Sequence, residues 1–393
     1  MKYLACLGRL PKISLVELES LFSNVRPFGK ELTTFETDFS EEEARVFFSR
    51  LGGSMKVAAE LPKGFNSLVK FLEELPEGKI TLGVSDFRKG ASPRKAQGEA
   101  LKLKKILARR GRSVRVLENK TAVLSTATSH HNQLSEKKNH EEIIFTDFGN
   151  FRVVFVQNIS EYAKRDQARP ARDAKVGMLP PKLAQILINL AGPLENGARI
   201  LDPFCGTGVV LQEATLDGFR VLGTDLNPRM IEFSERNLRW LESEYLTKVE
   251  KSDIIRRYSD FLLSEGDATS FNWKEFLNEK EKISAVVAEA FLGQPMSLPP
   301  AEIKLKQEKM TCKTILIGFF KNLSSQIESG TPVVIAIPAW LRENGEYSRL
   351  NILDEIEELG YNVRKFINLG TKDLLYYREG QIVAREIIVL RKK

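Results

Sequence analysis

The residues from Asp202 to Gly208 have the types and spacing of a nucleotide-binding loop. The apolar run 199–201 before them predicts a buried strand, and the apolar spacing from Val209 to Leu216 predicts a helix. Glycines between a strand and a helix let the backbone approach a ligand closely. A second strand is predicted over 218–224, followed by Asp225 and by a helix that opens at Pro228. Asp225 therefore lies where a ribose would bind, beyond the carboxyl end of the sheet.

Three ligands could use this loop. A dinucleotide fingerprint needs a third glycine where Leu211 stands, and a P-loop needs a lysine, which is missing between Asp202 and Asp225. The third candidate ligand is a nucleoside with an amino-acid tail, and S-adenosylmethionine fits this description. The alternative to a ligand-binding loop is an ordinary βαβ loop. The candidate contacts for this cofactor are Met178, Pro180, Asp202, Phe204, Gly206, Thr207, Gly208, Asp225, Leu226, Asn227, Asp267, Ala268 and Glu289.

Two further positions could carry chemistry. Asp267 follows the third predicted strand, 261–263, and could accept a hydrogen bond from the adenine amino group. The fourth strand, 283–288, ends at Glu289, whose carboxylate suits the adjacent N1–H and N2 amino groups of guanine, while Phe291 could stack on the base. The alternative is that Phe291 is core and Glu289 pairs with a structural arginine.

The elements around these residues predict an α/β fold. From Arg199 onward strands and helices alternate, as in a doubly wound parallel sheet, with later strands over Val333–Ile337 and Val363–Phe366. The end of the chain does not follow this alternation of strands and helices. Leu374–Tyr377 and Ala384–Leu390 predict an antiparallel hairpin, as in methyltransferase sheets that finish with an antiparallel strand.

Positive charge is concentrated in the first half of the chain. Residues 81–120 hold 12 basic and 3 acidic residues, many of them on a helix predicted over Gln97–Arg110. This excess favours a polyanion such as nucleic acid over the alternative of a solvated helix face. The candidate RNA contacts are Arg94, Lys95, Lys102, Lys104, Lys105, Arg109, Arg110 and Arg112, with Arg165, Arg169 and Arg172 on a polar linker.

Composition excludes other classes. The 393 residues are 42% hydrophobic and 28% charged with a net charge of +7, which is ordinary for a globular protein of two or three domains. The apolar runs are too short to span a membrane. The three cysteines have no metal-ligand spacing, and the three histidines lie in a segment interpreted as loop, so we expect no metal. We expect a cytoplasmic monomer.

The chain resembles the THUMP-domain tRNA guanine-N2 methyltransferases. The resemblance covers most of its length, from Leu51–Lys56 and Gly111–Arg115 through Arg165–Pro170 to the donor loop and Arg385–Ile387. It implies a ferredoxin-like N-terminal domain over 1–60, a THUMP-like RNA-binding domain over 61–158, a linker over 159–181 and a Rossmann-like class I methyltransferase domain over 182–393. A strand is also predicted over Val123–Ser125.

The implied activity is S-adenosylmethionine-dependent formation of N2-methylguanosine in tRNA, with position ten as the candidate site. The family's Asp-Pro-Pro-Tyr-Gly motif is replaced here by Glu289-Ala290-Phe291-Leu292-Gly293. Two alternatives therefore stay open. One is a tRNA-binding protein with an inactive methyltransferase domain, and the other is a DNA amino-methyltransferase; a small-molecule methyltransferase would leave the basic segment unexplained.

Overall fold

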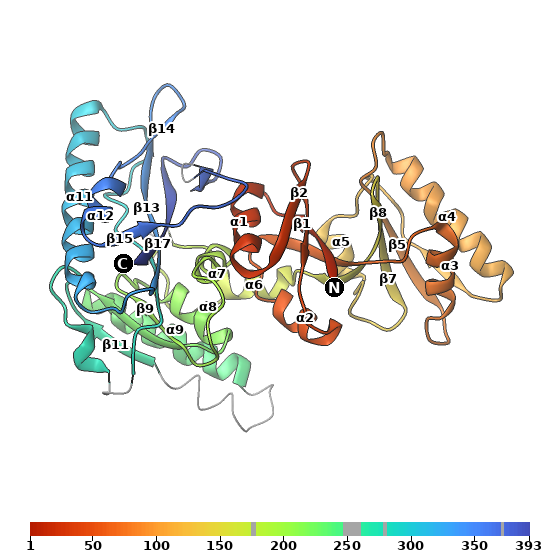
Figure 1. Ribbon diagram of the computed structural model, residues 1–393, viewed down its shortest axis with the longest axis horizontal. Coiled ribbons are helices and arrows are strands. Elements are labelled where there is room, and N and C mark those ends of the chain that lie inside the picture. The colour runs from red at the N-terminus through yellow and green to blue at the C-terminus, as the bar shows by residue number, and fades with distance from the viewer. Residues whose placement is uncertain (174–177, 247–260, 278–280, 371–372) are drawn as a thin grey trace. The chain divides into compact units, whose positions relative to one another are not determined.

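The computed structural model describes residues 1–173, 178–246, 261–277, 281–370 and 373–393. These residues form two units (Figure 1). The first holds Met1–Leu18 and Phe22–Ala163, and the second holds Glu19–Leu21 and Lys164–Lys393. Each unit is built on one sheet, so each is described by itself.

The sheet of the first unit has the order β2-β3-β1-β4-β8-β7-β5-β6. All its pairs are antiparallel except those of β5 with β6 and with β7. The strands are β1 Lys2–Leu7, β2 Ser23–Phe28, β3 Leu32–Glu36, β4 Ser54–Glu60, β5 Ile80–Asp86, β6 Val114–Val116, β7 His140–Thr146 and β8 Gly149–Val156. The predicted boundary at residue 60 does not interrupt this sheet, because β4 pairs with β8 across it, with Ala59 opposite Arg152.

Helices pack on this sheet, and the longest of them, α4, corresponds to the helix predicted over Gln97–Arg110. They are α1 Pro11–Leu21, α2 Glu41–Phe48, α3 Phe65–Glu73, α4 Pro93–Arg109 and α5 Thr126–His131. The long helix α4 begins at Ser92, whose side chain accepts a hydrogen bond from the Lys95 backbone, and buries only one face, formed by Ala96, Ala100, Leu103 and Leu107. The opposite face of α4 therefore remains available to solvent.

The strand predicted over Val123–Ser125 is wrong. Ser125 instead caps α5, because its hydroxyl accepts a hydrogen bond from the Thr128 backbone. The backbone N–H of Leu124 donates to the Ser85 hydroxyl and its carbonyl accepts from Lys56. Val123–Ser125 is thus tied to side chains and not to a strand ladder. The histidines interpreted as loop residues lie in α5 and at the start of β7.

A buried ion pair joins the strands on the two sides of residue 60. The ammonium of Lys56 on β4 donates to the Glu142 carboxylate on β7 at 2.6 Å, and both side chains are almost completely buried. The hydroxyls of Ser85 and Ser129 donate to the two oxygens of the same carboxylate, each at 2.6 Å. This pair is satisfied on both sides, as a buried charge must be.

The sheet of the second unit has the order β11-β10-β9-β12-β13-β17-β15. The first five strands are parallel, and β17 runs antiparallel between β13 and β15. The strands are β9 Arg199–Asp202, β10 Arg220–Asp225, β11 Phe261–Glu265, β12 Ala285–Glu289, β13 Pro332–Leu341, β15 Tyr361–Val363 and β17 Val383–Lys392, with the short β14 Tyr347–Ser348 on β13 and β16 Leu375–Tyr376 on β17. The strand order reverses between β9 and β12, which is where ligands bind in such sheets.

Helices cover this sheet, and a core of apolar side chains lies beneath them. They are α7 Pro181–Leu190, α8 Val209–Leu216, α9 Pro228–Leu246, α11 Glu302–Ser324 and α12 Leu353–Glu358, with a short 3-10 helix, η1, at Trp273–Phe276. None of the helices in the described ranges has the length and apolar character required to cross a lipid bilayer.

The predicted elements of this unit are largely confirmed. The antiparallel ending is present, since Leu375 and Tyr376 pair with Glu386 and Arg385. The strand predicted over Val363–Phe366 lies instead at Tyr361–Val363. The predicted polar linker is not irregular throughout, because Ile159–Gln167 forms the helix α6.

We expect Lys56→Met to lower the free energy of unfolding of the first unit by about 3–5 kcal/mol, because Glu142 would keep a buried charge without its partner. Lys56→Met combined with Glu142→Gln should recover most of this loss. Urea unfolding followed by circular dichroism measures both.

The matched control is the exposed Lys2–Glu60 pair on the same sheet, whose side chains are both 35% exposed. Lys2→Met should change the free energy of unfolding by at most about 1 kcal/mol. Equal losses for Lys2→Met and Lys56→Met would contradict the assigned importance of the buried pair.

Candidate active site

The glycine loop after β9 depends on backbone conformations that glycine adopts easily. Gly206 and Gly208 have φ of +51° and +78°. A Cβ on Gly208 would lie 2.8 Å from the Ser234 hydroxyl and 3.2 Å from its Cα, whereas a Cβ on Gly206 would meet nothing nearer than 3.9 Å. Gly208 is therefore needed for packing against α9, and Gly206 leaves open space beside the loop.

Side chains of α8 and α9 hold the loop from behind. Ser234 donates to the Gly206 carbonyl at 2.8 Å, and Asn237 donates to the Thr207 carbonyl at 2.9 Å. Gln212 donates to the Gly208 carbonyl at 2.9 Å. Sequence reasoning missed these three residues; the available signal was the polar Gln212 on α8, a helix that is otherwise apolar except for Glu213 and Thr215.

Three carboxylates end three neighbouring strands. Asp202, Asp225 and Glu289 are the last residues of β9, β10 and β12, so the parallel strands bring them to one edge of the sheet. Burial raises the pKa of Asp202 well above its usual range, and the charges of Asp225 and Glu289 raise it further. The site therefore concentrates negative charge in a desolvated place and suits a cationic ligand.

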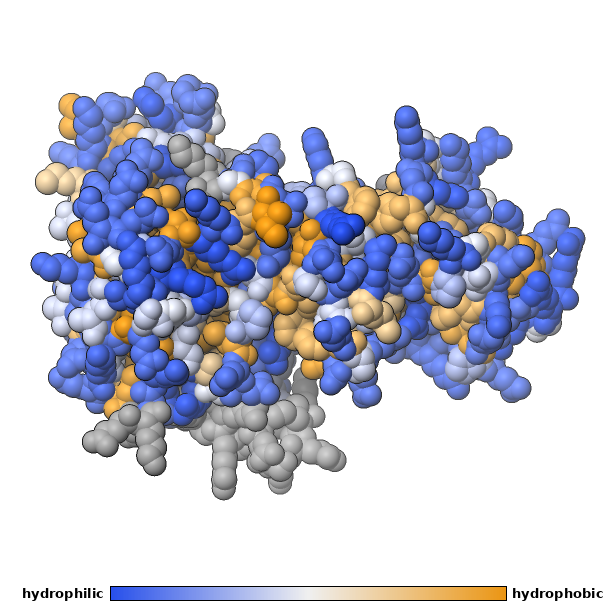
Figure 2. All heavy atoms as spheres, in the orientation of Figure 1, coloured by the Kyte–Doolittle hydropathy of each residue, from blue (hydrophilic) through white to orange (hydrophobic). Residues whose placement is uncertain are grey.

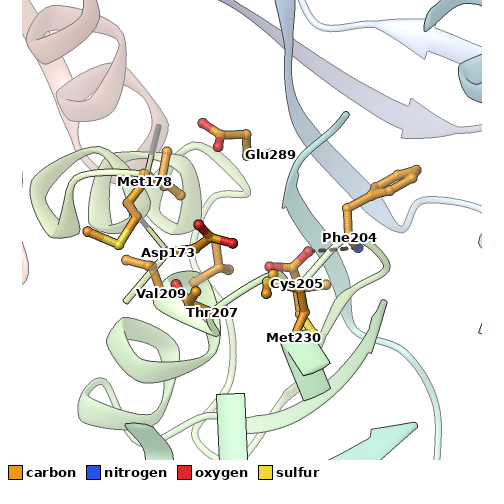
Figure 3. A pocket seen from close by; sticks show the side chains of 12 residues that line it. Asp173, Met178, Phe204, Cys205, Thr207, Val209, Met230 and Glu289 are labelled. Carbon is orange, nitrogen blue, oxygen red and sulfur yellow. Dashed lines mark hydrogen bonds between the residues drawn. The ribbon is translucent and has the colours of Figure 1, made fainter. Parts of the chain in front are cut away.

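Two of these carboxylates, Asp202 and Glu289, line one pocket together with residues of the glycine loop (Figure 3). Its cavity volume is about 80 Å³, and it is lined by Asp173, Met178, Leu179, Asp202, Phe204, Cys205, Gly206, Thr207, Val209, Val210, Met230 and Glu289. The ring of Phe204 points away from the other labelled side chains and packs edge-on against Phe319 of the core. Among the predicted cofactor residues, Met178, Asp202, Phe204, Gly206, Thr207 and Glu289 meet in the pocket, while Pro180 is buried as the residue before α7.

The other predicted cofactor residues lie along the same sheet edge, outside this pocket wall. Asp225 accepts hydrogen bonds from the backbone N–H groups of Gly206 and Asn227, both at 2.9 Å, and the Leu226 side chain is 70% exposed. Asp267 follows β11 and accepts from both the backbone and the hydroxyl of Thr269 at 2.8 Å, and the next residue, Ala268, is buried. An adenosine laid along the edge would pass these residues in turn.

Glu289 has an internal partner. Its Oε1 accepts from Nε of Arg385, a buried residue of β17, so the alternative of a structural arginine pair is partly realised. Burial raises the pKa of Glu289, and the Arg385 charge and hydrogen bond lower it. Phe291 is not core, because 37% of it is exposed. The carboxylate keeps further lone pairs for a substrate.

Two of the three linker arginines are not available to RNA. Arg165 is buried and donates to both oxygens of Glu213, at 2.7 and 3.0 Å. Arg169 is only 3% exposed, whereas Arg172 is exposed. The prediction that Arg165 and Arg169 contact RNA is therefore wrong, because sequence gives the charge of a segment and not the direction of its side chains.

The basic residues of α4 do face solvent. Hydrophilic residues crowd the end of the first unit formed by α3 and α4 (Figure 2). Within the described structure, Arg94, Lys104, Lys105 and Arg109 are exposed and have no side-chain partner. The others have intramolecular contacts, in that Lys95 donates to the Gly90 carbonyl, Lys102 lies over the Phe65 ring, Arg110 pairs with Glu73 and Arg112 donates to the Pro76 carbonyl.

The fold and the site define a class of protein. Numbered along the chain, the seven main strands have the order 3-2-1-4-5-7-6 with the seventh antiparallel, and the glycine loop follows the first. This is the class I methyltransferase fold. Residues 169–259 match the family model of the RMKL-like methyltransferase domain.

Curated relatives support the resemblance found in the sequence. The chain is 30% identical over 196 residues to the tRNA (guanine(10)-N2)-dimethyltransferase of Methanothermobacter thermautotrophicus, covering 49% of each chain. It is 35% identical over 146 residues to the enzyme of that name from Methanocaldococcus jannaschii, covering 35% of this chain and 37% of that one. The matches span about half or less of these relatives.

Among solved structures, TrmN from Thermus thermophilus is aligned over 100% of both chains at 18% identity and a TM-score of 0.46. A possible methylase from Clostridium difficile is aligned over 100% of this chain and 97% of that one at 14% identity and a TM-score of 0.44. The fold assignment rests on the strand order and not on these scores.

We expect Gly208→Ala to destabilise the second unit by about 2–4 kcal/mol, because it combines a left-handed backbone with a clash against Ser234. Urea unfolding measures the change. Gly197→Ala is the matched control, since Gly197 has φ of +75° but nothing within 4 Å of its added Cβ. A loss for Gly208→Ala no larger than that for Gly197→Ala would show that the contact with α9 has no energetic weight.

Proposed function

We propose that the protein is an S-adenosylmethionine-dependent methyltransferase that acts on the N2 amino group of guanosine in tRNA. The observation that carries this proposal is a carboxylate at the end of β12, Glu289, in the wall of the same pocket as the donor loop. The activity for which the two curated relatives are named supports this substrate.

The pocket fits the charge of the donor. S-adenosylmethionine, when bound, supplies an electrophilic methyl group on a sulfonium, and it also carries an ammonium group. Asp202 would bind the cationic end, and Gly206 and Thr207 would allow its close approach. Asp225 would accept from the ribose hydroxyls, with Leu226 against the adenine and Asp267 accepting from its amino group. No residue of the described pocket wall carries a positive charge that would repel the sulfonium.

Glu289 would position the acceptor base. Its carboxylate would accept from the N1–H and amino groups of guanine, and Phe291 would stack on the base. The amino nitrogen would bond to the methyl carbon as the bond from that carbon to the sulfonium sulfur breaks, which leaves a neutral thioether, and the proton that the nitrogen releases would go to Glu289. Arg385 would keep Glu289 ionised and fixed in orientation.

The basic face of α4 would bind the RNA backbone. Arg94, Lys104, Lys105 and Arg109 present charge without internal partners in the described structure, as phosphate contacts require. Arg172 would add a contact near the donor pocket. Position ten is the candidate nucleotide, and nucleoside analysis of the product tRNA measures both the modified position and the number of methyl groups added.

We expect activity to fall as pH drops through the raised pKa of Glu289, because the protonated carboxyl no longer accepts from the guanine edge. Glu289→Gln should remove this fall of activity at low pH, the acid limb of the pH–activity profile, and should lower kcat about 10²–10⁴-fold. Arg385→Gln should move the acid limb to higher pH, since it removes the charge that lowers the pKa of Glu289. Transfer of labelled methyl groups to unmodified tRNA across pH measures all three.

Arg349→Gln is the matched control. Arg349 pairs with Glu386, the residue next to Arg385, but lies outside the pocket wall. Its loss should leave the acid limb in place. An unchanged kcat in Glu289→Gln would rule out the assigned role of Glu289.

The pairing of Glu289 with Arg385 also favours a second candidate, a tRNA-binding protein whose methyltransferase domain is inactive. The same assay separates the two. A protein that binds S-adenosylmethionine and tRNA but transfers no methyl group to any guanosine would be this second candidate.

Removing the charges of Lys104, Lys105 and Arg109 together should weaken tRNA binding and reduce the slope of log K against log salt by about 2–3, at roughly 0.7–0.9 per phosphate contact. Arg110→Ala, at the C-cap of the same helix, is the control, because Arg110 already pairs with Glu73. Fluorescence anisotropy at several salt concentrations measures both. An equal slope in the triple variant and the wild type would contradict this interface.

A further inference from the structure

Arg169 holds a buried guanidinium with few partners. It is only 3% exposed, and its Nε and Nη1 have no hydrogen-bond partner among the described residues. Its Nη2 lies 3.7 Å from the Met178 sulfur and 3.6 Å from an Asp166 oxygen. A thioether is a weak acceptor, so at least two N–H groups of a permanently charged side chain lack compensation. Unpaired polar groups of this kind are costly in a protein interior.

The contrast with Arg165 shows that this is not a general property of the segment. Four residues earlier, Arg165 is also buried but donates through Nε and Nη2 to both oxygens of Glu213. The same stretch of chain therefore contains one arginine that is hydrogen-bonded to a buried carboxylate and one whose nearest carboxylate, that of Asp166, lies 3.6 Å away without a hydrogen bond. Arg169 therefore has the surroundings of an arginine whose carboxylate partner is supplied by another molecule.

Arg169 contacts the wall of the pocket in which the donor would bind. Its contact residue, Met178, is part of the pocket wall. Ala171 is fixed by two hydrogen bonds to Asn237, the same side chain that donates to the Thr207 carbonyl of the glycine loop. The segment after Arg169 is thus anchored to the part of the loop where the amino-acid end of the donor would lie.

The pocket wall has no partner for an anion. Its described charged residues are Asp173, Asp202 and Glu289, all acidic, which suits the ammonium and sulfonium groups but not the carboxylate of the donor. We propose that Arg169 binds this methionine carboxylate, with the flexible Met178 side chain giving way to it. The inference rests on the proposed donor. Met is well suited to this change because its unbranched side chain repacks at little cost.

A phosphate of RNA is a less suitable occupant. A phosphodiester is held within a bulky chain, and Arg169 is enclosed, whereas Arg172, three residues on, is exposed. Backbone N–H groups at the start of α8 are a second possible holder of the donor carboxylate. The experiment below distinguishes the proposal from two alternatives, which are that Arg169 binds an RNA phosphate and that backbone N–H groups bind the donor carboxylate.

The test compares S-adenosylmethionine with its decarboxylated analogue by isothermal titration calorimetry on the full chain. The preference of the wild type for the carboxylated donor should exceed that of Arg169→Met by about tenfold to a hundredfold, the value of one or two charge-assisted hydrogen bonds. Arg172→Met, the matched control, should keep the wild-type preference. Using the ratio of two ligands cancels any general change of the pocket.

Thermal stability is a second measurement, and it distinguishes the loss of a ligand contact from misfolding of the variant. Arg169→Met should be at least as thermally stable as the wild type without donor, since it removes unpaired buried N–H groups, but should show a smaller donor-induced rise in Tm. A lower Tm with equal loss of both ligands would make Arg169 a structural residue and overturn the inference. Equal preferences in wild type and Arg169→Met would assign the carboxylate to backbone groups.

Loss of tRNA affinity in Arg169→Met with donor binding intact would show that Arg169 acts in RNA binding, and this result would also overturn the inference. Failure of the wild type to bind either nucleoside would instead refute the proposed methyl donor itself, and with it the inference. The outcomes therefore separate an error about Arg169 from an error about the function.

Discussion

Negative charge held out of water at one edge of the second sheet is the constraint on which the rest of the site depends. Asp202, Asp225 and Glu289 end adjacent parallel strands, and burial together with their mutual repulsion opposes ionisation of Asp202. Such an arrangement costs free energy in the empty protein. A ligand with positive charge relieves that cost, so the geometry of this sheet edge favours cationic ligands before any single contact is considered.

Hydrogen bonds from behind hold the glycine loop at this edge of the sheet. The side chains of Ser234, Asn237 and Gln212 donate to carbonyls of the loop, and the Asp225 carboxylate accepts from the Gly206 N–H. The side of the loop that faces the pocket is left to the ligand. The same logic applies in the first unit, where Lys56 and Glu142 satisfy one another and the basic side chains of α4 point outward.

Periodicity and motif spacing predict the parts of this structure that depend on local sequence. The strand, glycine loop and helix around Asp202, the acidic ends of the strands and the antiparallel ending are all visible because each follows from residues close in the chain. The partners Arg385 and Glu213 are not visible, since they lie 96 and 48 residues from Glu289 and Arg165. Burial of charge is a property of the whole fold, and so the sequence alone predicts RNA contacts for Arg165 and Arg169, which the structure buries.

The altered motif after β12 shows how such long-range partners can replace local restraint. Two prolines would remove two backbone donors; here the Ala290 N–H instead donates to the Ala336 carbonyl and continues the ladder by one residue. Further on, Glu308 of α11 accepts from the Gln294 backbone and lies against Gly293, where a Cβ would come within 2.7 Å of its carboxylate. A longer acidic side chain, clamped by Arg385, thus ends a strand whose following turn is held by hydrogen bonds and not by proline rings. The loop is built differently, but its carboxylate still reaches the donor pocket.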